Sequence, residues 1–187
     1  MTGGLEGRFR PGHFEGVATV VAQLFNLVGP DAAYFGLKDY QQYRVIKAMA
    51  RDLHFPLEVV GCPTARENDG LAMSSRNRYL SPRERRAAPA LFKALGLARC
   101  LVEKGCPDPA RVEKAALEAL RQAGGFKPQY LKVVDPETLA SVKKIQEKVL
   151  VTAAVFLGKT RLIDNLEAQP IQPSKGFKRE PHASSHA

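Results

Sequence analysis

Hydrophobic residues recur at helical spacing in the first part of the chain. Residues 13–28 and 39–53 carry apolar side chains three or four positions apart, which is typical of amphipathic helices. Short apolar runs at residues 32–36 and 57–61 flank the second helix and predict buried strands. Strand, helix and strand with short connections predict a βαβ unit, whose parallel pairing places the loops after both strands at one edge of the sheet.

The pattern changes after the second strand. Residues 64–80 are polar and contain glycine, and Ser81-Pro82 predicts the start of one helix that runs to about Glu103. The next segments predict a helix, a strand and a hairpin around a Gly-Lys turn. They cover residues 109–122, 128–134, 149–156 and 160–166.

These patterns predict an α/β fold in two parts. Residues 1–80 would form the part with the parallel sheet, and residues 81–168 a small α+β domain. Residues 169–187 are rich in Pro, Ser, Lys and His and poor in large apolar side chains. We therefore expect a disordered tail there.

Composition and charge narrow the classes of partner. The chain has 187 residues, 44% of them hydrophobic, which is enough for one large domain or two small ones. Its formal charge of +9 suits an anionic small molecule or a nucleic acid equally well. Because the sequence has no zinc-ligand spacing, RNA-recognition aromatic motif or basic base-reading helix, charge is the only argument for nucleic acid, and we predict no such partner.

Several sequence features bear on location. No apolar run approaches the roughly 18 residues of a membrane-spanning helix, and the first residues lack the apolar stretch of a secretory signal. Cys62, Cys100 and Cys106 have neither metal-ligand spacing nor the even number of a disulfide framework. We therefore expect a cytoplasmic protein without a membrane segment, whose cysteines are reduced.

Lys38 follows the first predicted strand and stands at the start of the next helix. A helix N-terminus already has partial positive charge, so a lysine there is unfavourable unless an anion such as a phosphate binds beside it. The alternative is a solvated loop lysine. Asp39 and Gln42 have the spacing of a capping box, but they could also bind a ribose hydroxyl and a polar substrate, and both roles are compatible for Asp39.

A second polar loop follows the second predicted strand. Ser74, Ser75 and Arg76 offer hydroxyl donors, backbone amides and a guanidinium that can hold phosphate oxygens at two points. On spacing alone, a plain polar turn before a helix is the preferred interpretation of the segment. Arg10 and His13 precede the first long helix, where a histidine is more often a surface or capping residue than a catalytic one.

Four long segments identify a family when they are taken in order. They are LEGRFRPGHFEGVATVVAQLFNLVGPD, AYFGLKDYQQYRVIKAMARDL, RENDGLAMSSRNRYLS and KTRLIDN. From Gly4 to Asn165 the chain resembles the pantothenate synthetase family, also called the pantoate-beta-alanine ligases. The resemblance implies part of a Rossmann-like adenylate-forming domain with a parallel sheet, followed by a small α+β domain, in a homodimer.

The resemblance also implies an ATP-dependent ligase of coenzyme A biosynthesis. ATP and pantoate would form pantoyl adenylate and pyrophosphate, and the amine of beta-alanine would then displace AMP. Mg2+ would accompany ATP as a substrate complex, without a tightly bound cofactor or a metal site of the protein. Position by position, the implied ATP-binding residues are Gly36, Lys38, Asp39, Met73, Ser74, Ser75 and Arg76, of which Lys38, Ser74, Ser75 and Arg76 are implied as catalytic, and the implied pantoate-binding residues are Arg10, His13 and Gln42.

The chain differs from the family at its start. Family members begin with a strand and a loop that carries a His-x-Gly-His pattern, and neither is present in this sequence. Because deleting one well-placed donor can raise a reaction barrier by about 2.7 to 4 kcal/mol, we expect feeble ligase activity from this polypeptide alone. We also expect an uncovered sheet edge and uncovered apolar helix faces. The alternative is a non-catalytic dimerisation or regulatory fragment of the same family.

Overall fold

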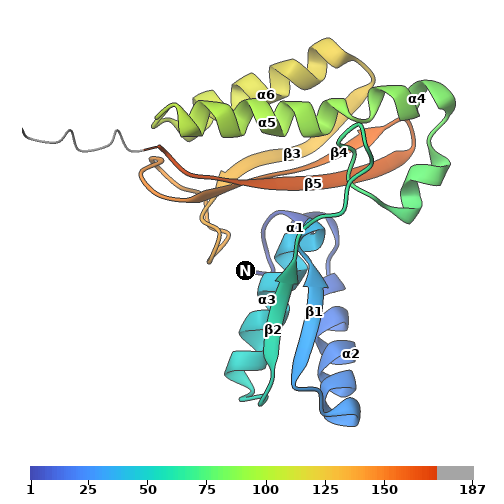
Figure 1. Ribbon diagram of the computed structural model, residues 1–187, viewed down its shortest axis with the longest axis vertical. Coiled ribbons are helices and arrows are strands. Elements are labelled where there is room, and N and C mark those ends of the chain that lie inside the picture. The colour runs from blue at the N-terminus through green and yellow to red at the C-terminus, as the bar shows by residue number, and fades with distance from the viewer. Residues whose placement is uncertain (172–187) are drawn as a thin grey trace, which may run out of the picture.

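The computed structural model describes residues 1–171, which form two units, the first lying below the second in Figure 1. The first unit consists of α1 (Glu6–Phe9), α2 (His13–Val28), β1 (Ala32–Gly36), the one-turn 3-10 helix η1 (Leu37–Asp39), α3 (Tyr40–Asp52) and β2 (Glu58–Cys62). A loop with the short 3-10 helix η2 (Ser75–Tyr79) leads to the second unit. That unit consists of α4 (Pro82–Ala87), α5 (Ala90–Glu103), α6 (Pro109–Ala123), β3 (Phe126–Val134), β4 (Val149–Leu157) and β5 (Thr160–Ala168).

The first unit is a βαβ unit with parallel strands, as the sequence predicts. Residues of β1 pair with residues of β2 from Ala32 opposite Glu58 to Gly36 opposite Cys62. Phe25 of α2, Ile46 of α3 and Val59 of β2 share one buried cluster, so both helices contribute to the core of the small parallel sheet. Because the strands are parallel, the loops that follow them leave from the same sheet edge.

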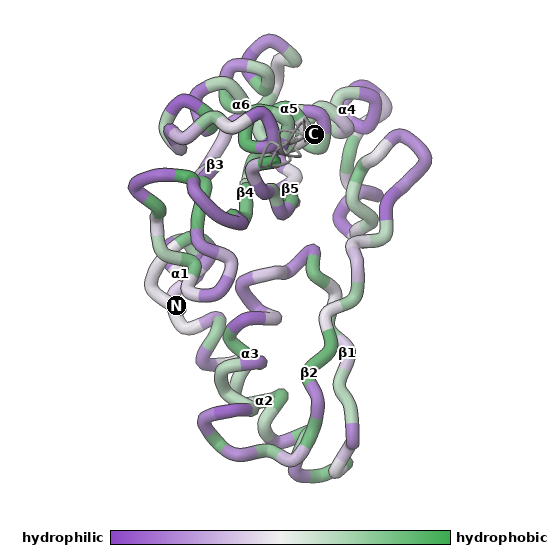
Figure 2. The backbone as a smooth tube through the Cα atoms, turned by 60° about the vertical axis from the view of Figure 1, so that its left-hand side comes forward, coloured by the Kyte–Doolittle hydropathy of each residue, from purple (hydrophilic) through white to green (hydrophobic). Residues whose placement is uncertain are grey.

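The second unit is an antiparallel sheet in the order β3-β4-β5, with α5 and α6 packed against it. The central strand β4 is buried along almost its whole length, because the core with α5 and α6 lies on one face of the sheet and the first unit on the other. Leu150 of β4 packs with Leu37 and Tyr40 of the first unit. Figure 2 shows hydrophobic residues gathering where α5 and β4 meet.

The helix predicted from Ser81 to Glu103 is wrong as a single element. The structure has two helices, because Pro89 lies between α4 and α5. Proline has no amide hydrogen to donate to the carbonyl one turn earlier, so the hydrogen-bond ladder is interrupted there. The short helix α1 was not predicted, since four residues give too little periodicity. The other predicted helices and strands agree with the structure to within two residues at each end, whereas the short 3-10 helices η1 and η2 were not predicted.

The division of the chain at residue 80 stays a prediction. Leu71 belongs to the buried core of the second unit, and Leu80 packs against that core. Most of the predicted tail, residues 172–187, lies outside the described residues. Within residues 1–171, every helix is too short or too polar to cross a lipid bilayer.

Candidate functional site

The loop after β1 holds Lys38 and Asp39 within η1. Asn165 of β5 fastens this turn, because its Nδ2 donates to the carbonyl oxygens of Leu37 at 2.9 Å and Lys38 at 3.0 Å. The capping box predicted for Asp39 and Gln42 is not formed. Asp39 ends the 3-10 turn with φ −94° and ψ 56°, away from the extended backbone of a usual capping residue. Its Oδ2 lies 3.5 Å from Lys38 Nζ instead.

The loop after β2 is fastened to the same strand. The two Nη atoms of Arg66 donate to the two carboxylate oxygens of Asp164 in β5, at 2.7 and 2.9 Å. The Arg66 guanidinium also lies 4.1 Å from the centre of the Phe92 ring. Further along, Ser74 Oγ accepts a hydrogen bond from the amide of Arg76 at 3.2 Å, which starts η2. Both loops therefore rest on β5.

Both loops line one cavity of about 260 Å³. Lys38 and Asp39 line it from the loop after β1, and Ser74 and Arg76 from the loop after β2. Arg10, between α1 and α2, lines it as well. The antiparallel sheet contributes Gln129, Phe156, Arg161, Leu162, Ile163 and Asp164. The structure thus brings Lys38 and Arg76 to a shared space, although they are far apart in the sequence.

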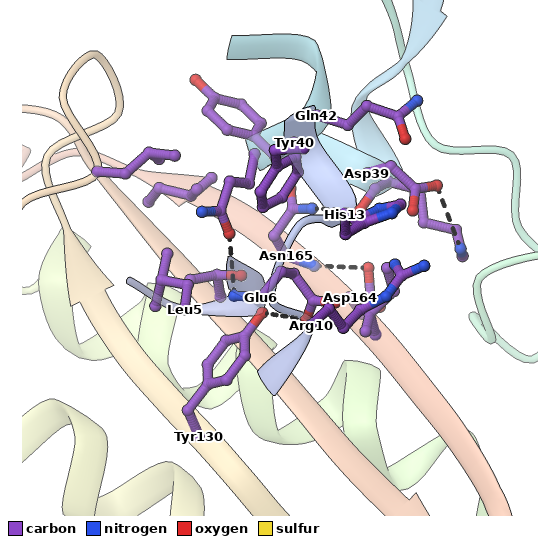
Figure 3. Close-up of a pocket in the computed structure, with 17 residues that line it drawn as sticks. Leu5, Glu6, Arg10, His13, Asp39, Tyr40, Gln42, Tyr130, Asp164 and Asn165 are labelled. Atoms are coloured by element: carbon purple, nitrogen blue, oxygen red, sulfur yellow. Dashed lines mark hydrogen bonds and ion pairs between the residues drawn. The ribbon is translucent and has the colours of Figure 1, made fainter. Parts of the chain in front are cut away.

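A smaller cavity of about 30 Å³ adjoins the larger one (Figure 3). His13 and Gln42 line the smaller cavity, and Arg10, Lys38 and Asp39 line both cavities. A space of this size holds about one water molecule. Arg10, His13 and Gln42, which were predicted to bind pantoate, therefore lie together. Because this cavity is too small for a substrate, these side chains would have to move apart, or the substrate would have to extend into the larger cavity.

Three of the predicted ATP-binding residues line neither cavity: Gly36, Met73 and Ser75. The Met73 side chain is half exposed, and its amide donates to the carbonyl of Ala65 at 2.9 Å. Ser75 is exposed at the start of η2. In this conformation, the loop after β2 therefore presents Ser74, Arg76 and Asn77 to the larger cavity, but not Met73 or Ser75.

Positive side chains outnumber negative ones around the larger cavity. Arg10, Lys38, Arg76 and Arg161 line it together with the carboxylates of Asp39 and Asp164, of which Asp164 is paired with Arg66. Burial, followed by the charge of Arg10, lowers the pKa of His13. Its imidazole is therefore neutral near pH 7. Among residues 1–171, no group of three or more His, Cys, Asp or Glu side chains could hold a metal ion. The arrangement suits a bound polyphosphate or carboxylate.

Sequence reasoning missed the buried polar residues that surround the site. Glu6 accepts hydrogen bonds from both Nη atoms of Arg161, at 2.7 and 2.8 Å, and from the Tyr130 hydroxyl at 2.7 Å. Asp164 and Asn165 fasten the two loops. The signal for Asp164 and Asn165 in the sequence was a charged and an amide residue within an otherwise apolar strand, in the segment KTRLIDN. This segment supported the family resemblance, but no role was predicted for its polar residues.

Comparison with known proteins identifies the family. The model of the pantoate-beta-alanine ligase family matches residues 1–167. The pantothenate synthetase of Sulfurihydrogenibium sp. (strain YO3AOP1) is 52% identical over 168 residues, which cover 89% of this chain and 60% of that protein. The pantothenate synthetase of Rhizobium meliloti (strain 1021) is 52% identical over 167 residues, or 89% of this chain and 57% of that protein.

Solved structures agree with the sequence comparison. Pantothenate synthetase from Thermus thermophilus is similar with a TM-score of 0.86 and 51% identity, over 90% of this chain and 61% of that one. The pantoate-beta-alanine ligase from Francisella tularensis, complexed with beta-gamma ATP and beta-alanine, has a TM-score of 0.64 and 30% identity, over 88% and 54% of the chains. The present chain thus spans about 60% of the length of such relatives. Its sequence and fold show that it belongs to the pantoate-beta-alanine ligase family.

Proposed function

We propose that this chain contains the ATP- and pantoate-binding residues of an enzyme that joins pantoate to beta-alanine. The main supporting observation is that Lys38 and Arg76, from the loops after two parallel strands, line one cavity of about 260 Å³. Cationic groups at the C-terminal edge of a parallel sheet suit the phosphates of a nucleotide. The Francisella tularensis relative, complexed with beta-gamma ATP and beta-alanine, supports the same substrate class.

The proposed reaction has two steps. A carboxylate oxygen of pantoate attacks the α-phosphorus of ATP, and pyrophosphate leaves with the electron pair of the broken P–O bond, which forms pantoyl adenylate. The amine nitrogen of beta-alanine then attacks the acyl carbon, AMP leaves with the electron pair of the C–O bond, and the new amide nitrogen loses a proton to solvent. Neither step requires a nucleophilic side chain, so positioning and charge stabilisation dominate.

The residues around the cavities have matching roles in this proposal. Lys38 and Arg76 would stabilise the negative charge on the departing pyrophosphate. In the smaller cavity, Gln42 would donate its amide hydrogens to pantoate, and Arg10 would pair with its carboxylate. Neutral His13 could donate to or accept from a pantoate hydroxyl. Contacts of ATP with Met73 and Ser75 would require the loop after β2 to close over the nucleotide. A contact with Gly36, at the end of β1, would require the nucleotide to extend to that strand.

Three further parts of the proposal concern the metal, assembly and location. Mg2+ would arrive bound to the phosphates of ATP as part of the substrate. The assembled protein would be a homodimer, which the exposed apolar side chains of α2 support. It would act in the cytoplasm, as expected from a sequence with neither a membrane-length apolar run nor a secretory signal.

Because the chain spans about 60% of the length of its relatives, we expect weak activity from the 187-residue polypeptide alone. The second candidate function is that of a non-catalytic part that assembles with another chain. The exposed apolar side chains of α2 favour this candidate as well. The two candidates differ in whether ATP and pantoate bind the folded chain.

Thermal unfolding with and without ATP, Mg2+ and pantoate tests the proposal. A ligand at 100 times its Kd stabilises the folded state by about 2.7 kcal/mol, which raises the Tm by several degrees for a chain of this size. We expect this rise in the wild-type protein, and at least half of it to be lost in Lys38→Ala and in Arg76→Ala. Lys143→Ala and Arg83→Ala are matched controls, because both side chains are exposed and line neither cavity.

The outcomes separate the two candidates. An unchanged wild-type Tm at millimolar ligand would contradict the proposal and leave the non-catalytic candidate. Equal losses in the control variants would show that bulk charge, rather than the cavity, attracts the ligand. Pantoate-dependent release of pyrophosphate at rates typical of whole enzymes would show that our expectation of weak activity is wrong.

A further inference from the structure

Two adjacent side chains in β5 connect both cavity loops to the antiparallel sheet. Asp164 is 2% exposed, and its carboxylate holds the guanidinium of Arg66, from the loop after β2, through two hydrogen bonds. Asn165 is also buried, and its amide group donates to the carbonyl oxygens of Leu37 and Lys38, in the loop after β1. One dipeptide of the second unit therefore contacts both loops of the first.

The contacts form an unbroken series of hydrogen bonds. Oδ1 of Asp164 accepts from Arg66 Nη2 at 2.9 Å and from the backbone amide of Asn165 at 2.8 Å. Arg66 is held further by the carbonyl of Gly70 at 3.0 Å and by the ring of Phe92. A planar guanidinium bound at both ends of a carboxylate has little freedom to rotate. The distance between the two loops is thus determined through Asp164 and Asn165.

We propose that Asp164 and Asn165 are positioning residues, which determine the relative placement of Lys38 and Arg76 across the cavity. They act through the backbone of the Lys38 turn and through Arg66, because their own polar groups are engaged with those partners. The proposal gives the second unit a direct part in assembling the anion site. It rests on the proposed function only for the choice of ATP as the ligand.

Two substitutions at Asn165 test the donor role in the full chain. Asn165→Ala removes the donor, and Asn165→Asp places a carboxylate against two carbonyl oxygens and beside Asp164. Loss of two neutral hydrogen bonds should weaken ATP binding about tenfold in Asn165→Ala, and Asn165→Asp should bind more weakly still. Without any ligand, amide hydrogen exchange over residues 36–42 should become faster in both variants.

A control and a second variant separate positioning from general stability. Glu167→Gln is the matched control, because Glu167 lies on the same strand and a glutamine there keeps an oxygen that can accept from the hydroxyl of Tyr40 on α3. It should leave both the exchange at residues 36–42 and the ATP affinity unchanged, even if its Tm falls. Arg66→Lys keeps the positive charge but cannot hold both carboxylate oxygens, so it should speed exchange in residues 64–76 and weaken ATP binding.

The outcomes are distinct from those for the proposed function. Unchanged exchange at residues 36–42 in folded Asn165→Ala and Asn165→Asp would overturn the positioning role. ATP affinity equal to that of the wild type in these two variants and in Arg66→Lys would also overturn the positioning role. If the wild-type chain fails to bind ATP, the proposed function is wrong, but the exchange measurements still decide whether Asp164 and Asn165 position the two loops.

Discussion

At the scale of single residues, Glu6 is the clearest case of a buried charge whose partners are all present. Both Nη atoms of Arg161 and the hydroxyl of Tyr130 donate to its carboxylate, and its amide donates to Gln41 Oε1 at 3.0 Å. Burial alone would raise the pKa of Glu6, but the hydrogen bonds from Arg161 and Tyr130 outweigh burial and lower it. The ion pair between Glu6 and Arg161 joins the segment before Arg10 and His13 to β5.

Replacing Glu6 by Gln should destabilise the protein by about 3 kcal/mol, because Arg161 would keep a largely buried charge without its partner. The folded-state pKa of Glu6 lies below its ordinary value of 4.5, so its contribution to stability is fully present above that pH and is lost as pH falls through the folded-state pKa. Urea unfolding at neutral and acidic pH should therefore show a smaller acid loss in Glu6→Gln than in the wild type.

Glu118→Gln serves as the control for this prediction. Glu118 pairs with Arg121 on the exposed side of α6, where an ion pair contributes at most about 1 kcal/mol. The free energy of unfolding of the Glu118→Gln variant should stay close to that of the wild type at both pH values. An equal loss in the two variants would mean that the buried pair has no special importance.

At the scale of elements, α6 shows how local and tertiary interactions combine. Asp108 caps the helix, because its Oδ1 accepts from the amide of Ala110 at 2.9 Å, and Pro109 suits the first helical position. Val112, Ala116 and Leu120 then lie on one face and are completely buried against α5 and the sheet. The cap marks where α6 begins, and the apolar spacing marks which face of the helix is buried.

Replacing Asp108 by Ala should lower the free energy of unfolding by about 1 kcal/mol, because the amide of Ala110 at the start of α6 loses its acceptor. Asp108→Asn keeps a side-chain oxygen at the same position and should be nearly neutral. Chemical unfolding monitored by circular dichroism measures both. Equal stability of the Ala and Asn variants would show that solvent satisfies these amides as well as the cap does.

At the scale of the whole molecule, the first unit leaves apolar surface uncovered. Val20, Leu24, Leu27 and Val28 of α2 and Tyr34 of β1 are each at least half exposed, and Leu27 is 83% exposed. Parallel sheets normally have more strands and both faces covered, whereas this one has only β1 and β2 within the described residues. The lower end of the molecule in Figure 1 is therefore suited to contact with another polypeptide.

We expect the wild-type chain to self-associate as its concentration rises, because this association removes the exposed apolar surface from water. The double variant Leu24→Lys and Leu27→Lys should shift the equilibrium to the monomer. Leu97→Lys is the control, since Leu97 is exposed on α5 of the other unit. Light scattering after size-exclusion chromatography gives the mass, and a wild-type monomer at every concentration would contradict this prediction.

Periodicities along the chain were enough to predict the order and type of most elements, because helical and strand patterns are local. The sequence predicted the parallel pairing of β1 and β2 and the placement of their following loops at one edge. It also singled out Lys38 and Arg76, which line the same cavity. It failed at Pro89, where a missing amide divides one apolar helical pattern into α4 and α5, and at Asp39, where a 3-10 turn replaces the expected cap.

Which polar groups meet depends on the tertiary structure. Glu6 and Arg161 are 155 positions apart, and Asn165 lies 127 positions from Lys38, so no local pattern relates them. Their pairing depends on how the antiparallel sheet packs against the first unit, which is set by the shapes of both apolar surfaces together. For the same reason, the sequence named the residues that we propose for anion binding but could not show that β5 holds the two cavity loops.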